Sequence, residues 1–224
     1  MRFDLSRTVV VFDLDDTLYQ EADYVESGVR YVCDRINALY GKNLYLEVLG
    51  AIRLDSGVDW LGLLCERAGL PIAAKESLLW LYRLHEPNIQ LLVDCKTAIE
   101  KIADAASAVA VLTDGRSITQ RLKLKSLGLS ALPVYISEEY GSAKPAPDRF
   151  KTIQSHFPAE HYVYVADNVI KDFAGCNPLG WIGIGMLGDR RNIHSQSLQD
   201  HPEALHPAYW VNDWEDLCKL LLNG

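Results

Sequence analysis

Residues 9–18 read Val-Val-Val-Phe-Asp-Leu-Asp-Asp-Thr-Leu, a short apolar run that ends in three carboxylates. Such a run predicts a buried strand, and ligands of open parallel sheets bind beyond the carboxyl ends of their strands. Asp13 and Asp15 are therefore candidate active-site acids. The alternative is a solvated acidic turn that caps the next segment. Both acids can face one site only if the backbone curls after the strand.

Short apolar runs alternate with helical patterns from Ile89 onward, which is typical of a parallel α/β sheet. After the first strand, further strands are expected at residues 108–112, 134–136, 162–165, 181–184 and 209–211. Helices are expected at about residues 95–106, 117–127, 147–156 and 169–176, with a last one from Asn212 or Asp213 to the C-terminus.

Residues 19–93 differ from the rest of the chain because they contain no convincing strand pattern. Apolar side chains recur at helical spacing instead, as in Val25, Val29, Val32, Ile36 and Leu39. We therefore expect an α/β core formed by residues 1–18 plus 94–224, with residues 19–93 inserted as a helical unit after the first strand. At roughly 150 residues per domain, a chain of 224 residues fits a core that carries an insertion.

Composition excludes several classes of protein. With 49% apolar and 23% charged residues the chain is neither disordered nor a repetitive fibre. Its net charge of −8 disfavours nucleic acids and anionic membrane surfaces as partners, whereas a small phosphorylated substrate needs only local positive charge. The five cysteines include no Cys-x-x-Cys pair, which favours a reducing cytoplasm. No apolar run near the N-terminus is long enough for a signal peptide or a membrane span.

Polar residues follow the next expected strands as well. Thr113, Asp114 and Gly115 stand at the start of a predicted helix, where a hydroxyl and free backbone N–H groups could bind an anion. An ordinary turn and helix cap is the alternative. Lys144 lies in a loop in which Pro145 keeps it out of helix, so its ammonium could be a fixed counter-charge for phosphate or simply a surface charge.

Asp167 directly follows the strand expected at residues 162–165. Beside Asp13 and Asp15 it would complete an oxygen-rich group of hard ligands suited to Mg²⁺. Several like charges in one pocket are tolerated only if a cation neutralises them. The sequence therefore predicts a metal site at this edge of the sheet.

Taken in order, these positions resemble the four motifs of the haloacid dehalogenase superfamily: Asp13-x-Asp15-x-Thr17, Thr113, Lys144 and Asp167-x-x-x-x-Asp172. The insert is similar in position to the helical cap of the superfamily's first subgroup, which enters just after the first motif. The resemblance covers the whole core. It implies a Rossmann-like, three-layer parallel-sheet core with an inserted α-helical cap domain.

The resemblance also implies roles for individual residues. The implied catalytic pair is Asp13 as nucleophile and Asp15 as general acid and base. The implied phosphate binders are Thr113, Asp114, Gly115 and Lys144. The implied Mg²⁺ ligands are Asp13, Asp167 and the backbone carbonyl of Asp15, with Asp172 supporting the metal or Lys144. Ala166 stands where many relatives have glycine, which is a small departure.

The predicted function is therefore that of a Mg²⁺-dependent phosphatase that acts on a small phosphorylated metabolite through an aspartyl-phosphate. Dehalogenating relatives lack an acid at the position of Asp15, so its presence favours phosphoryl transfer. A sugar phosphomutase of the same fold is the close alternative. A phospho-aspartate receiver module is a rival of another class, although such modules are about 120 residues long and carry no insert of 75 residues.

Two further signals are weaker. Gly183, Gly185 and Gly188 match the pattern Gly-x-Gly-x-x-Gly of dinucleotide sites, but no apolar helical period follows them. Arg30, Arg53, Arg190 and Arg191 are candidate substrate contacts, although a solvated helix surface explains each of them better. The sequence indicates no oligomeric state.

Overall fold

The computed structural model describes residues 3–188, 192, 196 and 202–223. Six strands form one parallel sheet in the order β3-β2-β1-β4-β5-β6. They are β1 (Thr8–Phe12), β2 (Ala108–Thr113), β3 (Val134–Ile136), β4 (His161–Ala166), β5 (Ile182–Met186) and β6 (Tyr209–Val211). The strands expected from the sequence are all present, and the predicted α/β fold class is confirmed.

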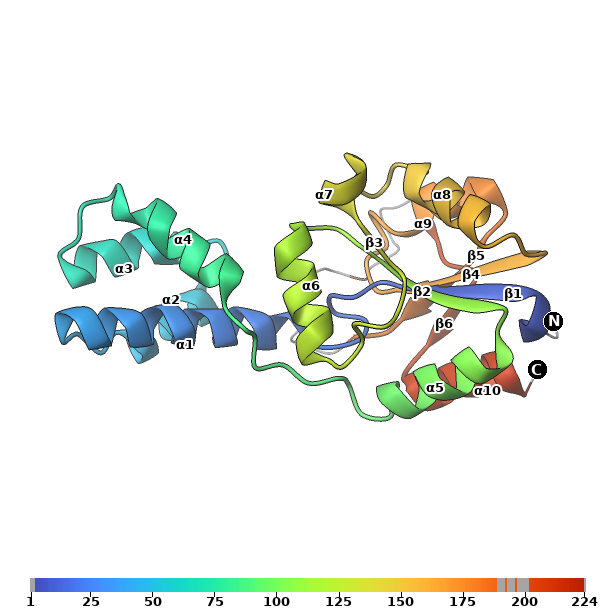
Figure 1. Cartoon of the computed structure of the whole chain (residues 1–224), viewed down its shortest axis with the longest axis horizontal. Coiled ribbons are helices and arrows are strands. Elements are labelled where there is room, and N and C mark those ends of the chain that lie inside the picture. The colour runs from blue at the N-terminus through green and yellow to red at the C-terminus, as the bar shows by residue number, and fades with distance from the viewer. Residues whose placement is uncertain (1–2, 189–191, 193–195, 197–201, 224) are drawn as a thin grey trace.

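Helices lie on both faces of this sheet and in a separate group to one side (Figure 1). The group follows β1 and contains α1 (Glu21–Tyr40), α2 (Tyr45–Leu54), α3 (Trp60–Ala68) and α4 (Ala74–Leu84). The remaining helices are α5 (Cys95–Ala105), α6 (Ser117–Ser126), α7 (Ser137–Tyr140), α8 (Asp148–His156), α9 (Phe173–Cys176) and α10 (Trp214–Leu222). Short 3₁₀ segments occur at Leu5–Arg7, Asn177–Leu179 and Glu203–Leu205.

The sheet is the middle one of three layers. Helices α5 and α10 cover one face, and α8 and α9 cover the other (Figure 1). Strand β1 lies between β2 and β4, so its alternate side chains enter both apolar layers: Val10 and Phe12 on one side, Val9 and Val11 on the other. All four of these side chains are fully buried, which explains the continuous apolar run in the sequence.

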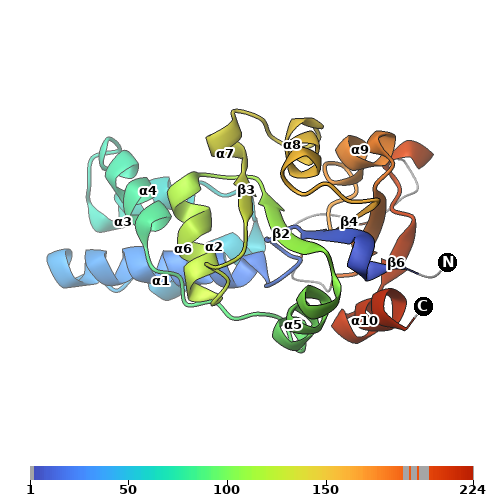
Figure 2. The ribbon, with the colours of Figure 1, turned by 45° about the vertical axis from the view of Figure 1, so that its right-hand side comes forward.

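Helices α1–α4 enclose a hydrophobic cluster of their own, formed by side chains such as Val29, Val32, Ile36, Val48 and Leu64. Figures 1 and 2 place these helices at the opposite end of the molecule from both termini. The chain returns to the sheet through residues 85–94, which form no regular element, although the insert was expected to be helical throughout. The Leu92 N–H donates to the Leu18 carbonyl at 2.9 Å, so the outgoing and returning segments lie side by side.

One expected helix is shorter than predicted, for an identifiable reason. The helix expected at residues 169–176 covers only α9, because the side chains of Asn168 and Asp172 accept the backbone N–H groups of Ile170 and Asn168. Such bonds offer the backbone an alternative to helix. The turn that results holds Asp172 in place.

The Gly-x-Gly-x-x-Gly pattern has a packing explanation. A Cβ at Gly183 would lie 2.6 Å from the ring of Phe173, and a Cβ at Gly185 would lie 2.4 Å from the ring of Trp210. Both glycines therefore let aromatic rings pack closely on β5, and a dinucleotide site is not supported. Among the described residues, no helix combines the length and the apolar character needed to cross a bilayer.

Candidate active site

The loop that follows β1 curls as the two candidate acids require. Asp16 adopts a left-handed conformation, with φ of 52°, and the Leu18 N–H donates to the Leu14 carbonyl at 3.0 Å. Aspartate is one of the few residues other than glycine that visits this region at modest cost. The Asp16 carboxylate in turn accepts the backbone N–H of Glu21 at 2.8 Å, which fixes the start of α1 beside the loop.

Parallel pairing brings the carboxyl ends of β1, β2 and β4 to one edge of the sheet. A cavity of about 150 Å³ opens there. Its wall contains Asp13, Asp15, Asp16, Glu21, Thr113, Asp114, Lys144, Asp167, Asn168 and Lys171. The structure thus brings most of the candidate residues together around one space. Gly115 and Asp172 do not belong to this wall as described, and Asp172 lies fully buried next to it.

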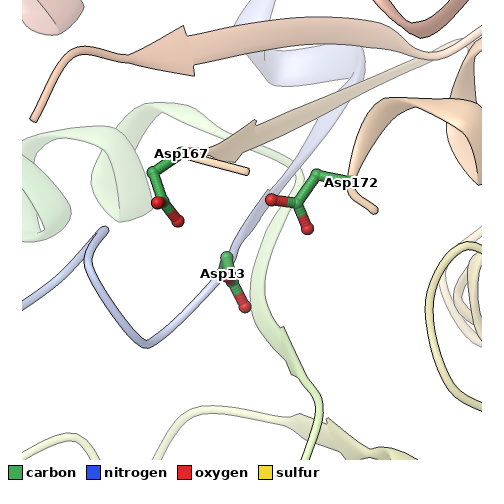
Figure 3. A group of neighbouring side chains, drawn as sticks. All are labelled: Asp13, Asp167 and Asp172. Carbon is green, nitrogen blue, oxygen red and sulfur yellow. The ribbon is translucent and has the colours of Figure 1, made fainter. Parts of the chain in front are cut away.

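Asp13, Asp167 and Asp172 form a compact acidic group (Figure 3). Each offers a carboxylate oxygen, and these oxygens all lie within 4.8 Å of one another. The Lys144 ammonium lies 2.9 Å from Asp13 Oδ1 and 2.6 Å from Asp172 Oδ1. Asp13 and Asp172 therefore share one buried ammonium, and ionisation of all three acids would leave the group with an excess of negative charge.

Burial and mutual repulsion shape the protonation of this group. Burial raises the pKa of Asp13 to about 7 against the opposing effect of Lys144. Burial, with Asp13 and Asp172 nearby, raises the pKa of Asp167 to about 9. Burial lowers the pKa of Lys144, but the carboxylates of Asp13 and Asp172 outweigh it and raise that pKa above its usual range. The lysine is therefore a permanent cation, whereas Asp13 and Asp167 ionise less readily than ordinary aspartates and would ionise fully only with further positive charge nearby.

The donor set fits a divalent cation. Asp172 is already satisfied, because it accepts hydrogen bonds from Lys144, from the Tyr164 hydroxyl at 3.1 Å and from the Asn168 N–H at 2.8 Å. Asp13 and Asp167 retain oxygens that face the cavity without a full counter-charge. Carboxylate oxygens are the hard ligands that Mg²⁺ prefers. These two acids could hold such an ion, with Asp172 fixing Lys144 beside it.

Asp15 has a different environment from Asp13, although only one residue separates them. Its carboxylate lies 2.7 Å from Lys123 Nζ, accepts from Gln120 Nε2 at 2.8 Å and accepts from the Tyr19 hydroxyl. Burial would raise the pKa of Asp15, but Lys123 and these hydrogen bonds hold it below its usual value. Asp15 is thus an anion anchored by its own cation at the edge of the cavity.

Thr113 and Gly115 are less free than the sequence suggested. The Thr113 hydroxyl oxygen accepts from Gln120 Nε2 at 2.7 Å while still lining the cavity. The Gly115 N–H donates to Ser137 Oγ at 2.9 Å, so this amide is not an open donor. In this structure the serine that follows β3 accepts that N–H, and phosphate binding at Gly115 stays a prediction.

Asp114 joins the ends of three segments. Its carboxylate accepts the Lys144 N–H at 3.1 Å and pairs with Arg149, a fully buried residue of α8. The Arg149 guanidinium also donates to the carbonyls of Thr113 at 2.7 Å and Tyr135 at 3.1 Å. In this way Asp114 positions the Lys144 loop rather than presenting an unpaired acid to the cavity.

A family model for haloacid dehalogenase-like hydrolases matches residues 8–180. The chain belongs to the haloacid dehalogenase-like hydrolases. The resemblance noted in the sequence is thereby confirmed, together with the fold that it implied.

Curated relatives and a solved structure agree with this membership. The chain is 27% identical to the glyceraldehyde 3-phosphate phosphatase of Methanocaldococcus jannaschii, over 96% of each chain. It is 28% identical to the ribulose-1,5-bisphosphate 5-phosphatase of Halopiger xanaduensis, over 77% of this chain and 82% of that one. The fold is similar to that of the HAD hydrolase YfnB of Bacillus subtilis bound to magnesium, with a TM-score of 0.67, 18% identity and coverage of 99% and 100%.

Sequence reasoning missed several residues that complete the site of this haloacid dehalogenase-like hydrolase. Lys123, Gln120 and Tyr19 surround Asp15, and Glu21 and Lys171 line the cavity. A signal for the first two exists, because Gln120 and Lys123 share the inward face of α6 with Leu124. Polar residues on the buried face of an amphipathic helix need polar partners.

Of the candidate arginines, Arg30 and Arg53 do not form part of this cavity wall. Arg30 and Arg53 lie on the helical insert, where both guanidinium groups pair with Glu26. They are largely exposed, as expected for a solvated helix surface. Arg190 and Arg191 lie outside the described residues.

Proposed function

We propose that this protein is a Mg²⁺-dependent phosphatase that hydrolyses a small phosphorylated sugar through an aspartyl-phosphate on Asp13. The observation that carries the proposal is the pairing of two different acids in one small cavity: Asp13 beside Lys144, and Asp15 beside Lys123. One acid can attack phosphorus while the other moves a proton. The names of the relatives, phosphatases of sugar phosphates, support the substrate class.

The chemistry divides between the two carboxyl groups. An Asp13 oxygen attacks phosphorus and the bond from phosphorus to the sugar oxygen breaks. Asp15, which takes up a proton from solvent when the anionic substrate binds, gives that proton to the sugar oxygen. In the second step Asp15 takes a proton from water, and the hydroxide attacks the phosphorus of the aspartyl-phosphate. Inorganic phosphate leaves, and Asp13 is regenerated as a carboxylate.

Charge compensation lets an anionic nucleophile meet an anionic phosphate. Mg²⁺, held by Asp13, Asp167 and the backbone carbonyl of Asp15, supplies positive charge to the phosphate oxygens when it is bound. Lys144 supplies a second positive charge that Asp172 keeps in place, 2.6 Å away. The Thr113 hydroxyl and Lys144, which both line the cavity, together hold the transferred group.

The helical insert of residues 19–93 acts in this proposal as a cap that selects the substrate. Glu21, the first residue of α1, already contributes to the cavity wall, so the insert reaches the reacting centre. Closure of such a cap would exclude water and strengthen the contacts with phosphate, and opening would release product.

A panel of phosphorylated metabolites, incubated with the protein and Mg²⁺ and assayed for inorganic phosphate, tests the proposal. Release of phosphate from short sugar phosphates, abolished by chelator and restored by Mg²⁺, is the expected result. Isomer formation without phosphate release would identify a phosphomutase instead. Full activity in excess chelator would contradict the metal assignment.

A further inference from the structure

A buried lysine lies directly behind Asp15. Lys123 belongs to α6, its side chain is 4% exposed, and its Nζ lies 2.7 Å from Asp15 Oδ1. Of the described residues, Asp15 contributes to the cavity wall and Lys123 does not. An ammonium is removed from water only at a large cost in free energy unless it is paired. The position of this lysine therefore indicates a function directed at Asp15 rather than at a substrate.

Lys123 also contacts the helical insert. Its Nζ lies 4.2 Å from the centre of the Tyr24 ring, and Tyr24 belongs to the first turn of α1. The Thr119 hydroxyl of the same helix donates to the Arg83 carbonyl in α4 at 3.1 Å. Figures 1 and 2 both place α6 between the insert and the sheet. One helix thus touches the insert with one side and the candidate acid with another.

Gln120 completes the contacts of Asp15 on this helix. Its Nε2 lies 2.8 Å from Asp15 Oδ2, 2.7 Å from Thr113 Oγ1 and 2.9 Å from the Asp114 carbonyl. An amide nitrogen carries two hydrogens, so three acceptors share two donors. The bond from Gln120 is therefore divided, and the ion pair with Lys123 and the hydrogen bond from the Tyr19 hydroxyl are the contacts that fix the Asp15 carboxyl group.

We infer that Lys123 is a positioning residue that holds the Asp15 carboxyl group at the cavity wall in the orientation needed to protonate the leaving oxygen. The inference rests on the proposed function, in which Asp15 is the general acid. Lys123 itself transfers no proton and touches no substrate. Its loss would leave Asp15 held only by the Tyr19 hydroxyl and the divided bond from Gln120, so proton transfer to a poorly activated leaving group would be slowed.

Leaving-group dependence distinguishes this role from a structural one. An alkyl phosphate needs a proton on its leaving oxygen, whereas 4-nitrophenolate leaves as a stable anion without one. In Lys123→Met, we expect kcat/KM to fall by roughly 10- to 100-fold for an alkyl phosphate and by less than about threefold for 4-nitrophenyl phosphate. Lys123→Arg, which keeps the charge, should recover most of the loss.

The matched control is Lys125→Met on the same helix. Lys125 is 65% exposed and pairs with Glu86, and an exposed pair of this kind contributes little to stability. The kcat/KM of Lys125→Met should stay within about twofold of the wild-type value for both esters. Equal losses for both esters in Lys123→Met, or no loss for either, would overturn the inference.

A double variant protects the test against misfolding. Lys123→Met leaves the partly buried Asp15 carboxylate without its cation, whereas Lys123→Met combined with Asp15→Asn removes both charges. If Lys123 acts through Asp15, the double variant should match Asp15→Asn in its leaving-group dependence. A further tenfold loss specific to the alkyl ester in the double variant would contradict the inference.

The same assays separate failure of the inference from failure of the proposed function. If wild type hydrolyses neither ester, or if Asp15→Asn shows no preference for the activated ester, the proposed function fails. If wild type and Asp15→Asn behave as expected and Lys123→Met does not, the inference alone fails.

Discussion

Two carboxylates that are two positions apart lie in opposite electrostatic environments. Asp13 belongs to a group of three acids, two of which pair with Lys144, and its pKa is raised to about 7 mainly by burial. Asp15 is paired with Lys123, and its pKa is lowered in spite of burial. The first environment would carry an excess of negative charge with all its acids ionised, so it can accept a cation. The second is neutral and fixes one carboxylate.

Because of this difference, Asp13 and Asp15 can have separate roles although their side chains are identical. An acid in a group that attracts a divalent cation can be held against phosphate as a nucleophile. An acid with its own buried lysine keeps a fixed orientation when substrate arrives. Variants of the two acids and of their neighbours test whether these environments determine the two roles.

Asp13→Asn should have the largest effect. The amide has the same shape as the carboxylate but is a poor nucleophile, so turnover should fall by at least about 10⁴-fold. Phosphate release under saturating substrate and Mg²⁺ measures the loss, and circular dichroism checks that the fold is retained. A variant that kept a tenth of the wild-type rate would rule out covalent catalysis at Asp13.

Asp15→Asn should reduce turnover by roughly 10²- to 10⁴-fold, because proton transfer is lost while the nucleophile remains. Trapping of a phosphorylated protein by rapid acid quench should still succeed with an activated aryl phosphate. The two variants would thereby show different blocked steps. If neither formed a phosphorylated protein, the division of labour between the two acids would have to be given up.

Mg²⁺ binding should release about one proton per ion at pH 7.5. Asp167, with a pKa of about 9, is mostly protonated in the metal-free protein, and Asp13, with a pKa of about 7, is partly so. The cation binds the ionised forms, so affinity should rise as pH rises. Calorimetric titration in buffers of different ionisation enthalpy counts the protons.

Asp167→Asn should bind Mg²⁺ more weakly and release fewer protons, because the group that loses the proton is gone. Lys125→Met should leave both quantities unchanged. If Mg²⁺ affinity does not depend on pH, Asp13 and Asp167 are already ionised in the metal-free protein. The proposed difference in pKa between these acids and Asp15 would then be wrong.

Glu21→Gln should have the smallest effect. Burial and the nearby Asp15 raise the pKa of Glu21 from 4.5 to about 7, against the opposing effect of Lys123. The folded protein therefore favours the protonated form, and this contribution is lost as pH rises from about 4.5 through 7. Because Glu21 is partly exposed, we expect a stabilisation of about 1 to 2 kcal/mol at pH 8 in chelator.

The same variant should show almost no change in stability near pH 4, where Glu21 is protonated in the folded state and mostly so in the unfolded state. Chemical denaturation at the two pH values measures the difference. Equal changes in the free energy of unfolding at pH 4 and at pH 8 would mean that the pKa of Glu21 is not raised in the folded protein.

Much of the fold follows from local sequence. The run at residues 9–12 predicts a doubly buried strand because a central parallel strand has apolar layers on both sides. The α9 region was not predictable in the same way, because the side chains of Asn168 and Asp172 replace helical hydrogen bonds there. Whether such side chains bond to backbone depends on what surrounds them.

The sequence shows which acids of the site follow buried strands, and parallel pairing then requires Asp13, Thr113 and Asp167 to meet at one edge. Which cation each acid faces cannot be read from the sequence and is seen only in the folded chain. Lys123 is separated from Asp15 by 108 positions. Their contact depends on the left-handed turn at Asp16 and on how α6 packs between the insert and the sheet, because side-chain direction is set by packing between distant segments rather than by spacing along the chain.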